Sequence, residues 1–219
     1  MEDLARDHRC ELREDAGLLG IGIEPSVAIG QRMLLLETEE GNVLWDMIPL
    51  VDEAALEAIR VRGEVQAIAI SHPHYYSGMV EWSRALGGVP ILLHEADSAW
   101  IMRPDPAIEL WSGATRVLPG GVTLLRVGGH FAGGTVLHHG DLLLSGDIVQ
   151  VIPDREYVSF MWSYPNLIPL PAREIERIAA ALEPWPFERI VGAWWDRIVP
   201  GDGNEVVRRS AERYVRALR

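Results

Sequence analysis

Short apolar runs typical of buried strands recur along this chain, and segments with helical spacing lie between them. Three such runs lie near the N-terminus, at residues 17–25, 27–38 and 42–47. Turn residues around Gly41 join the last two as a predicted hairpin. The continuous run at 65–71 is typical of a strand buried on both faces, and it ends abruptly at His72.

The same alternation continues to the C-terminus. Further strands are predicted within residues 90–94, 115–129, 134–147 and 189–194, and helices within residues 51–59, 76–88, 95–101, 171–182 and 204–219. Mixed sheets covered by helices are therefore expected, in a single α/β (α+β) domain over residues 1–219. The charged segment 1–16 is treated as a flexible N-terminal segment, because the sequence leaves open whether it is ordered.

Charge and cysteine content exclude several classes of protein. The net charge is −12 and the sequence contains no Lys, so an acidic surface with only Arg as base predicts no nucleic-acid partner. Cys10 is the only cysteine, which excludes an intrachain disulfide and a cysteine-based zinc site. The first twenty residues are charged, and no apolar run is long enough to span a membrane. We expect a cytoplasmic protein without membrane attachment.

Residues suited to metal binding stand at the ends of predicted strands. His72 and His74 follow the run 65–71, glycines flank His130, and Asp147 follows the apolar run 142–144. Each one alone is more simply explained as a hydrogen-bonded structural residue or a turn former. Three histidines and one carboxylate together match the ligands of a catalytic hydrolase metal site.

The order and spacing of these motifs resemble the metallo-β-lactamase superfamily over roughly residues 20–195. The matching segments are 34–38 (LLLET), 42–46 (NVLWD), 71–74 (SHPH), 129–136 (GHFAGGTV), 144–147 (LSGD) and 190–192 (IVG). The resemblance implies a four-layer αββα sandwich, the fold of these metallohydrolases.

The resemblance also implies roles for individual residues. His72 and His74 correspond to the first two histidines of the family's HxHxDH motif, and His130 corresponds to the third ligand of the first metal. Asp147 corresponds to the carboxylate that bridges two metals in family members. Asp46 corresponds to a buried acid that supports the site.

The chain departs from the family pattern at the second metal. Tyr76 stands in place of the motif's Asp and Ser77 in place of its last His. The final family ligand falls near Ala193 or Trp194, and no histidine follows His139. A single metal held by three histidines and Asp147 is therefore expected. Zinc is the first choice, with iron, manganese or a metal-free protein as alternatives.

Tyr76 has two interpretations that the sequence leaves open. Its phenol could donate a hydrogen bond to a developing oxyanion beside the metal, which would make Tyr76 and Asp147 the catalytic residues. Alternatively, Tyr75 and Tyr76 fill space left by the lost metal.

The predicted function is that of a metal-dependent hydrolase acting on a small molecule. A metal in the retained site would lower the pKa of water to about 7 and generate a hydroxide that attacks an ester, thioester or lactone bond. The alternative is a non-catalytic binding or interaction protein on the same scaffold. Arg155 and Arg197 are candidates for binding a substrate carboxylate, although surface ion pairs explain them more simply. The substrate and the oligomeric state do not follow from the sequence.

Overall fold

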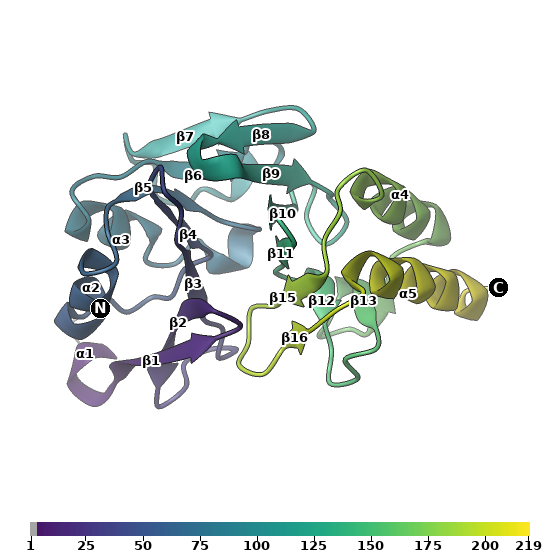
Figure 1. The fold of residues 1–219 in the computed structure, drawn as a ribbon, viewed down its shortest axis with the longest axis horizontal. Helices are drawn as coiled ribbons and strands as arrows, with labels where there is room; N and C mark the ends of the chain where they lie inside the picture. Colours follow the sequence, from purple (N-terminus) through teal and green to yellow (C-terminus); the bar gives the residue numbers. More distant parts are fainter. Residues whose placement is uncertain (1–3) are drawn as a thin grey trace.

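The computed structural model describes residues 4–219 as two facing sheets with helices on both outer sides. Figure 1 shows α2 (Glu53–Arg60) and α3 (Met79–Ala85) on one side, and α4 (Ala172–Leu182) and α5 (Gly203–Ala217) on the other. This arrangement confirms the expected αββα sandwich. Within residues 4–219, no helix is both long and apolar enough to cross a membrane.

The first sheet has seven strands in sequence order over the described chain. They are β1 (Arg9–Asp15), β2 (Leu18–Glu24), β3 (Met33–Leu36), β4 (Asn42–Trp45), β5 (Val65–Ala69), β6 (Ile91–His94) and β7 (Ile108–Trp111). Strands β1 to β4 pair antiparallel, whereas β4 to β7 pair parallel. The parallel strands place their carboxyl ends at one edge of the sheet.

The second sheet runs in the order β16, β15, β11, β10, β9, β8, and a third, small sheet follows it. Their strands are β8 (Thr115–Leu118), β9 (Val122–Arg126), β10 (Thr135–His139), β11 (Leu142–Leu144), β15 (Arg189–Val191) and β16 (Ile198–Val199), then β12 (Ile148–Val151), β13 (Val158–Ser163) and β14 (Ile168–Pro169). The short helices are α1 (Leu4–Asp7), η1 (Pro73–Tyr75), η2 (Glu95–Trp100) and η3 (Pro119–Gly121).

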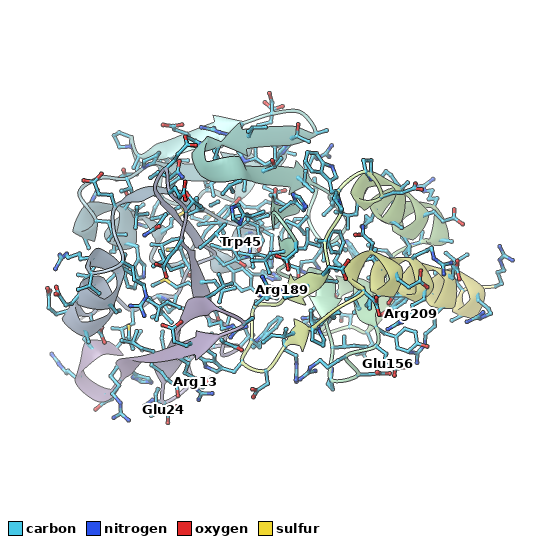
Figure 2. The ribbon with its side chains drawn as sticks, viewed as in Figure 1. Arg13, Glu24, Trp45, Glu156, Arg189 and Arg209 are labelled. Carbon is cyan, nitrogen blue, oxygen red and sulfur yellow. The ribbon has the colours of Figure 1, made fainter. Side chains whose placement is uncertain are left out.

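Alternation along the strands divides the apolar side chains among three cores. On β3, Leu35 packs toward α2 and α3, whereas Leu34 packs between the sheets. On β10, Leu137 joins the core between the sheets and Val136 packs toward α4 and α5. Trp45, labelled in Figure 2, is almost fully buried in the central core. Strands buried on both faces therefore read as continuous apolar runs.

Most of the predicted elements are present, but the edges of the sheets differ from the predictions. The run 27–38 contains a strand only at Met33–Leu36, and α4 begins directly after Pro171. Within the segment 1–16, β1 pairs with β2 over seven residues. Residues 1–3 of that segment lie outside the described part of the chain. Because β1 is an edge strand with mostly exposed, charged side chains, its sequence lacks the apolar run of an inner strand.

Candidate metal centre

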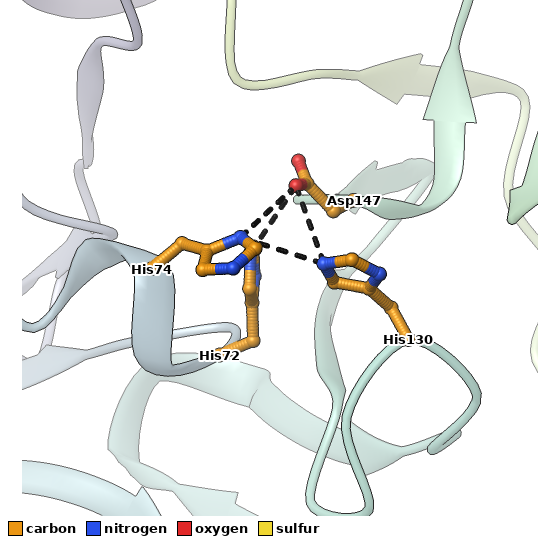
Figure 3. A group of neighbouring side chains, drawn as sticks. All are labelled: His72, His74, His130 and Asp147. Atoms are coloured by element: carbon orange, nitrogen blue, oxygen red, sulfur yellow. Dashed lines mark hydrogen bonds and ion pairs between the residues drawn. The ribbon is translucent and has the colours of Figure 1, made fainter. Parts of the chain in front are cut away.

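The four residues predicted as metal ligands lie together, with their ring nitrogens and a carboxylate oxygen facing one another (Figure 3). His72 and His74 lie in the turn after β5, at and within η1, and His130 lies in the loop between β9 and β10. Asp147 lies between β11 and β12. Strands of both sheets thus end at the same place. The fold brings together residues up to 75 positions apart in the sequence.

The ligand atoms of these residues lie close enough together to hold a metal ion. Nδ1 of His74 lies 3.2 Å from Nε2 of His72 and 3.4 Å from Nε2 of His130. Oδ2 of Asp147 lies 3.3, 3.6 and 3.7 Å from the facing nitrogens of His72, His74 and His130. A tetrahedron with Zn–N bonds of about 2.0–2.1 Å has edges of about 3.3–3.4 Å. Three of these five separations match that edge within about 0.1 Å, and those from Asp147 to His74 and His130 are slightly longer, so the cluster is close to the size that a single ion needs.

Hydrogen bonds on the far side of the rings direct two of the imidazoles toward the centre. Nδ1 of His130 donates to the carbonyl oxygen of Trp162 at 2.9 Å, which leaves Nε2 with its lone pair facing the other ligands. Nδ1 of His72 is hydrogen-bonded to Oγ of Ser71 at 2.8 Å. Burial lowers the pKa of both His72 and His130, so both rings favour the neutral form that binds metals.

Asp147 is buried but remains ionised. Burial alone would raise the pKa of its carboxyl group, but the facing imidazoles of His72 and His74 outweigh burial and hold that pKa well below its usual range. Its second oxygen, Oδ1, accepts a hydrogen bond from the hydroxyl of Tyr75 at 2.9 Å. The carboxylate is therefore fixed, with Oδ2 directed at the three imidazoles.

The phenol at this site comes from Tyr75, whose role the sequence analysis did not identify. Tyr75 is fully buried, and burial raises the pKa of its hydroxyl well above the usual value, so it acts as a hydrogen-bond donor. Tyr76 is half-buried and packs against the core beneath α2 and α3. Burial also raises the pKa of Tyr76, and within the described chain no hydrogen bond links it to the four ligands. A catalytic role for Tyr76 stays a prediction.

The loop that carries His130 is held by a residue the sequence analysis passed over. The carboxylate of Asp97, within η2, accepts a hydrogen bond from the backbone N–H of Gly133 at 2.7 Å. The N–H of Thr135 donates to the carbonyl of Ser71 at 2.9 Å, which ties this loop to the His72 turn. Gly129 has φ +89°, and a Cβ there would lie 2.9 Å from Ile148. The loop conformation therefore requires glycine beside the ligand.

Asp46 supports the His72 turn from beneath, in the buried position that the resemblance implies. Its Oδ1 accepts a hydrogen bond from the N–H of Ser71 at 2.7 Å, and the side chain is almost fully buried. Burial raises the pKa of Asp46 to about 7. Within residues 4–219 its Oδ2 has no hydrogen-bond partner.

His94, His138 and Trp194, which lies where the final family ligand is missing, make hydrogen bonds to the backbone elsewhere in the fold. Nε2 of His94 donates to Gly113 O at 3.0 Å while its Nδ1 accepts from Ala96, and Nε2 of His138 donates to Pro186 O at 2.7 Å. Trp194 donates its indole N–H to Ile29 O at 2.9 Å. Over the described chain, His72, His74, His130 and Asp147 are the one group of three or more side chains that could hold a metal ion.

A cavity of about 820 Å³ opens beside His74 and His130. The segment after Asp147 contributes Trp162 to its wall. The cavity therefore gives a small molecule access to one side of the ligand cluster, where the side chain of His74 is 47% exposed.

Comparison with known proteins identifies relatives in sequence and in fold. No family model matches the chain. The uncharacterized protein YmaE of Bacillus subtilis is 46% identical over 212 residues, which cover 94% of this chain and 77% of YmaE.

Solved structures with similar folds share much less sequence. VMB-1 aligns with a TM-score of 0.71 at 13% identity, covering 96% of this chain and 99% of its own. The metallo-β-lactamase FIM-1 from Pseudomonas aeruginosa, in its mono-zinc form, aligns at 0.67 and 12% identity, with 94% and 96% covered. TTHA1623 in a di-iron-bound form aligns at 0.61 and 22% identity, with 84% and 95% covered. At these identities the comparison shows a shared fold.

Proposed function

Since the chain belongs to the same family as YmaE and has the metallo-β-lactamase fold, we propose that it is a metal-dependent hydrolase. Its substrate is a small molecule with an ester, thioester or lactone bond, and one metal ion serves the reaction. The observation that carries this proposal is the near-tetrahedral spacing of the four ligand atoms. FIM-1 in a mono-zinc form and TTHA1623 in a di-iron form provide examples of metal binding on this fold.

The protein's own residues prepare the site in three ways. His72, His74 and His130 would hold the metal, which when bound supplies a Lewis acid that lowers the pKa of water and polarises a carbonyl. Asp147 contributes negative charge at Oδ2 while Tyr75 fixes Oδ1. The cavity beside His74 and His130 admits the substrate from the side where the cluster is accessible.

The alternative is a binding protein that uses this scaffold without catalysis. The replacement of the second-metal ligands by Tyr76 and Ser77 and the packing role of Trp194 favour this alternative. Such a binding protein would have the same fold as the proposed hydrolase but would show no turnover that a chelator abolishes.

Metal analysis combined with a substrate panel tests the proposal. We expect about one zinc or iron per chain in protein purified without chelator, and hydrolysis of at least one ester, thioester or lactone that a chelator abolishes. His130→Ala should lose both metal and turnover. His139→Ala, outside the cluster on β10, is the matched control and should keep both. A chain that takes up no metal, or an H130A variant with undiminished metal, contradicts the proposal.

A further inference from the structure

The cavity beside the candidate metal centre has a wall of unusual charge. Three of its lining residues are arginines: Arg126 at the end of β9, and Arg173 and Arg177 on α4. Glu174 is the one acidic residue among those that line it in the described chain. In a protein of net charge −12, this reverses the local sign of charge next to the ligand cluster.

The guanidinium groups of Arg126 and Arg177 are held in place but keep free donors. Nε of Arg126 donates to Ala132 O at 2.9 Å, and Nη2 of Arg177 donates to Val127 O at 2.7 Å. Both bonds attach the arginines to the loop that carries His130. A guanidinium has five N–H donors, so each retains terminal N–H groups for a ligand.

Arg173 and Glu174 complete this charged wall. The side chain of Arg173 is 85% exposed, and its Nε lies 3.8 Å from Glu174, too far for a hydrogen bond. Glu174 accepts a hydrogen bond from Nε of Arg177 at 2.9 Å. One carboxylate therefore offsets part of the charge of three arginines.

Three large aromatic side chains also line the cavity. Trp100 and Phe131 meet edge to face with ring centroids 5.4 Å apart, and β13 contributes Trp162 to the lining. Trp100 and Trp162 are each more than half exposed although both are large and apolar. Exposed aromatic rings beside a charged wall are suited to a ligand with an apolar part and an anionic part.

We propose that the substrate carries a carboxylate or phosphate group separated from the scissile bond by an apolar chain. Arg126, Arg173 and Arg177 bind the anionic group, and Trp100, Phe131 and Trp162 contact the chain. This inference rests on the proposed hydrolase function, since it specifies the substrate of the same site. Arg155 and Arg197, the sequence candidates for binding a carboxylate, are not among the residues that line the cavity.

Binding of three amides that resist hydrolysis tests the inference directly. Hexananilide, adipic acid monoanilide and 6-(phosphonooxy)hexananilide share one acyl chain and end in a methyl, a carboxylate or a phosphate group. Titration calorimetry on the metal-loaded chain should show at least tenfold tighter binding of one or both anionic amides than of hexananilide. The tighter of the two identifies the anionic group.

Variants then test whether the charged residues of the cavity wall cause the preference for anionic amides. Arg126→Gln, Arg173→Gln and Arg177→Gln should each reduce the ratio of anionic to neutral affinity by at least threefold, whereas Glu174→Gln should increase it. Arg60→Gln on α2, which removes one positive charge away from the cavity, is the control and should leave the ratio unchanged. Arg173 and Glu174 make no bond to the His130 loop, so their variants decide the result if R126Q or R177Q fails to fold.

Equal binding of the three amides, or an unchanged ratio in R173Q and E174Q, would overturn the inference. Hydrolysis of 4-nitrophenyl hexanoate and mono-4-nitrophenyl adipate separates this failure from failure of the proposed function. Chelator-sensitive hydrolysis without an anion preference retains the hydrolase and rejects the arginine site. Anion preference in binding without hydrolysis of any ester retains the arginine site and rejects the hydrolase.

Discussion

The candidate metal centre and the neighbouring region around Tyr76, Ser77 and Trp194 lie on the same scaffold but are built differently. In the first, three of the four candidate ligands are braced by hydrogen bonds. Ser71 holds His72, the carbonyl oxygen of Trp162 holds His130, and Tyr75 holds Asp147. In the second, Tyr76 packs against an apolar core and Trp194 is bonded to a backbone carbonyl. Polar networks are maintained where a charge must be held, whereas aromatic packing suffices where none is.

Removing the negative charge of Asp147 should produce the largest effect on metal affinity, because it removes the charge that distinguishes the candidate metal centre from the neighbouring region. Asp147→Asn keeps the shape of the side chain but loses the negative charge that faces three imidazoles. We expect metal affinity to fall by about 1,000-fold and turnover to fall with it, because ligand charge dominates such sites. Competition with a chromogenic chelator measures the affinity. Affinity within about tenfold of the wild type would show that Asp147 is not part of the site.

Restoring second-metal ligands at Tyr76 and Ser77 tests whether the neighbouring region can still bind a metal. Tyr76→Asp combined with Ser77→His restores the residue types of the family motif in a region now built for packing. We expect a loss of about 3 kcal/mol in the free energy of unfolding, because a carboxylate replaces a half-buried ring near Asp97 and Asp46. Metal content should stay at about one per chain. Two metals per chain would show that the region can still hold an ion.

The two adjacent tyrosines offer a matched pair of substitutions. Tyr75→Phe removes the hydroxyl that donates to Asp147, and we expect a fall in metal affinity of about 10- to 100-fold. Tyr76→Phe should change metal affinity by less than about threefold. Isothermal titration with zinc and turnover measurements compare the variants. If Tyr76→Phe lowers turnover more than Tyr75→Phe does, Tyr76 is the catalytic phenol.

The pH dependence of stability should report the buried carboxyl group beneath the centre. The folded-state pKa of Asp46 is about 7, above the ordinary value of 3.8, so the folded chain binds a proton more tightly than the unfolded chain does. Its contribution to stability is therefore fully present below about pH 4 and is lost as the pH rises to about 7.

Asp46→Asn should remove this dependence while keeping an oxygen for the N–H of Ser71. At pH 8 the variant should be more stable by about 1–2 kcal/mol, because asparagine carries no charge where Asp46 is buried and ionised. Urea denaturation of both proteins between pH 5 and pH 8 measures the difference. Parallel curves would show that Asp46 does not titrate in this range.

Much of the fold and the four residues of the candidate metal centre could be predicted from sequence, for local reasons. Runs such as 65–71 are apolar because both faces of their strands are buried, and the stripe on α4 packs into the core as its spacing predicts. The candidate ligands lie in loops at the ends of strands, and their order along the sequence made them recognisable: His72, His74, His130 and Asp147. The edge strands β1, β7 and β16 were missed because exposed or very short strands lack that pattern.

The sequence by itself determined the layered architecture and the four residues able to hold a metal, because burial imposes a pattern on neighbouring residues. The tertiary structure alone decided which residues brace and surround them. Tyr75 rather than Tyr76 reaches Asp147 because successive residues of the η1 turn point in different directions. Asp97 meets Gly133, and Arg126 lines a cavity with Arg177, across 36 and 51 positions of chain. No local pattern encodes such contacts, since they depend on how whole layers pack.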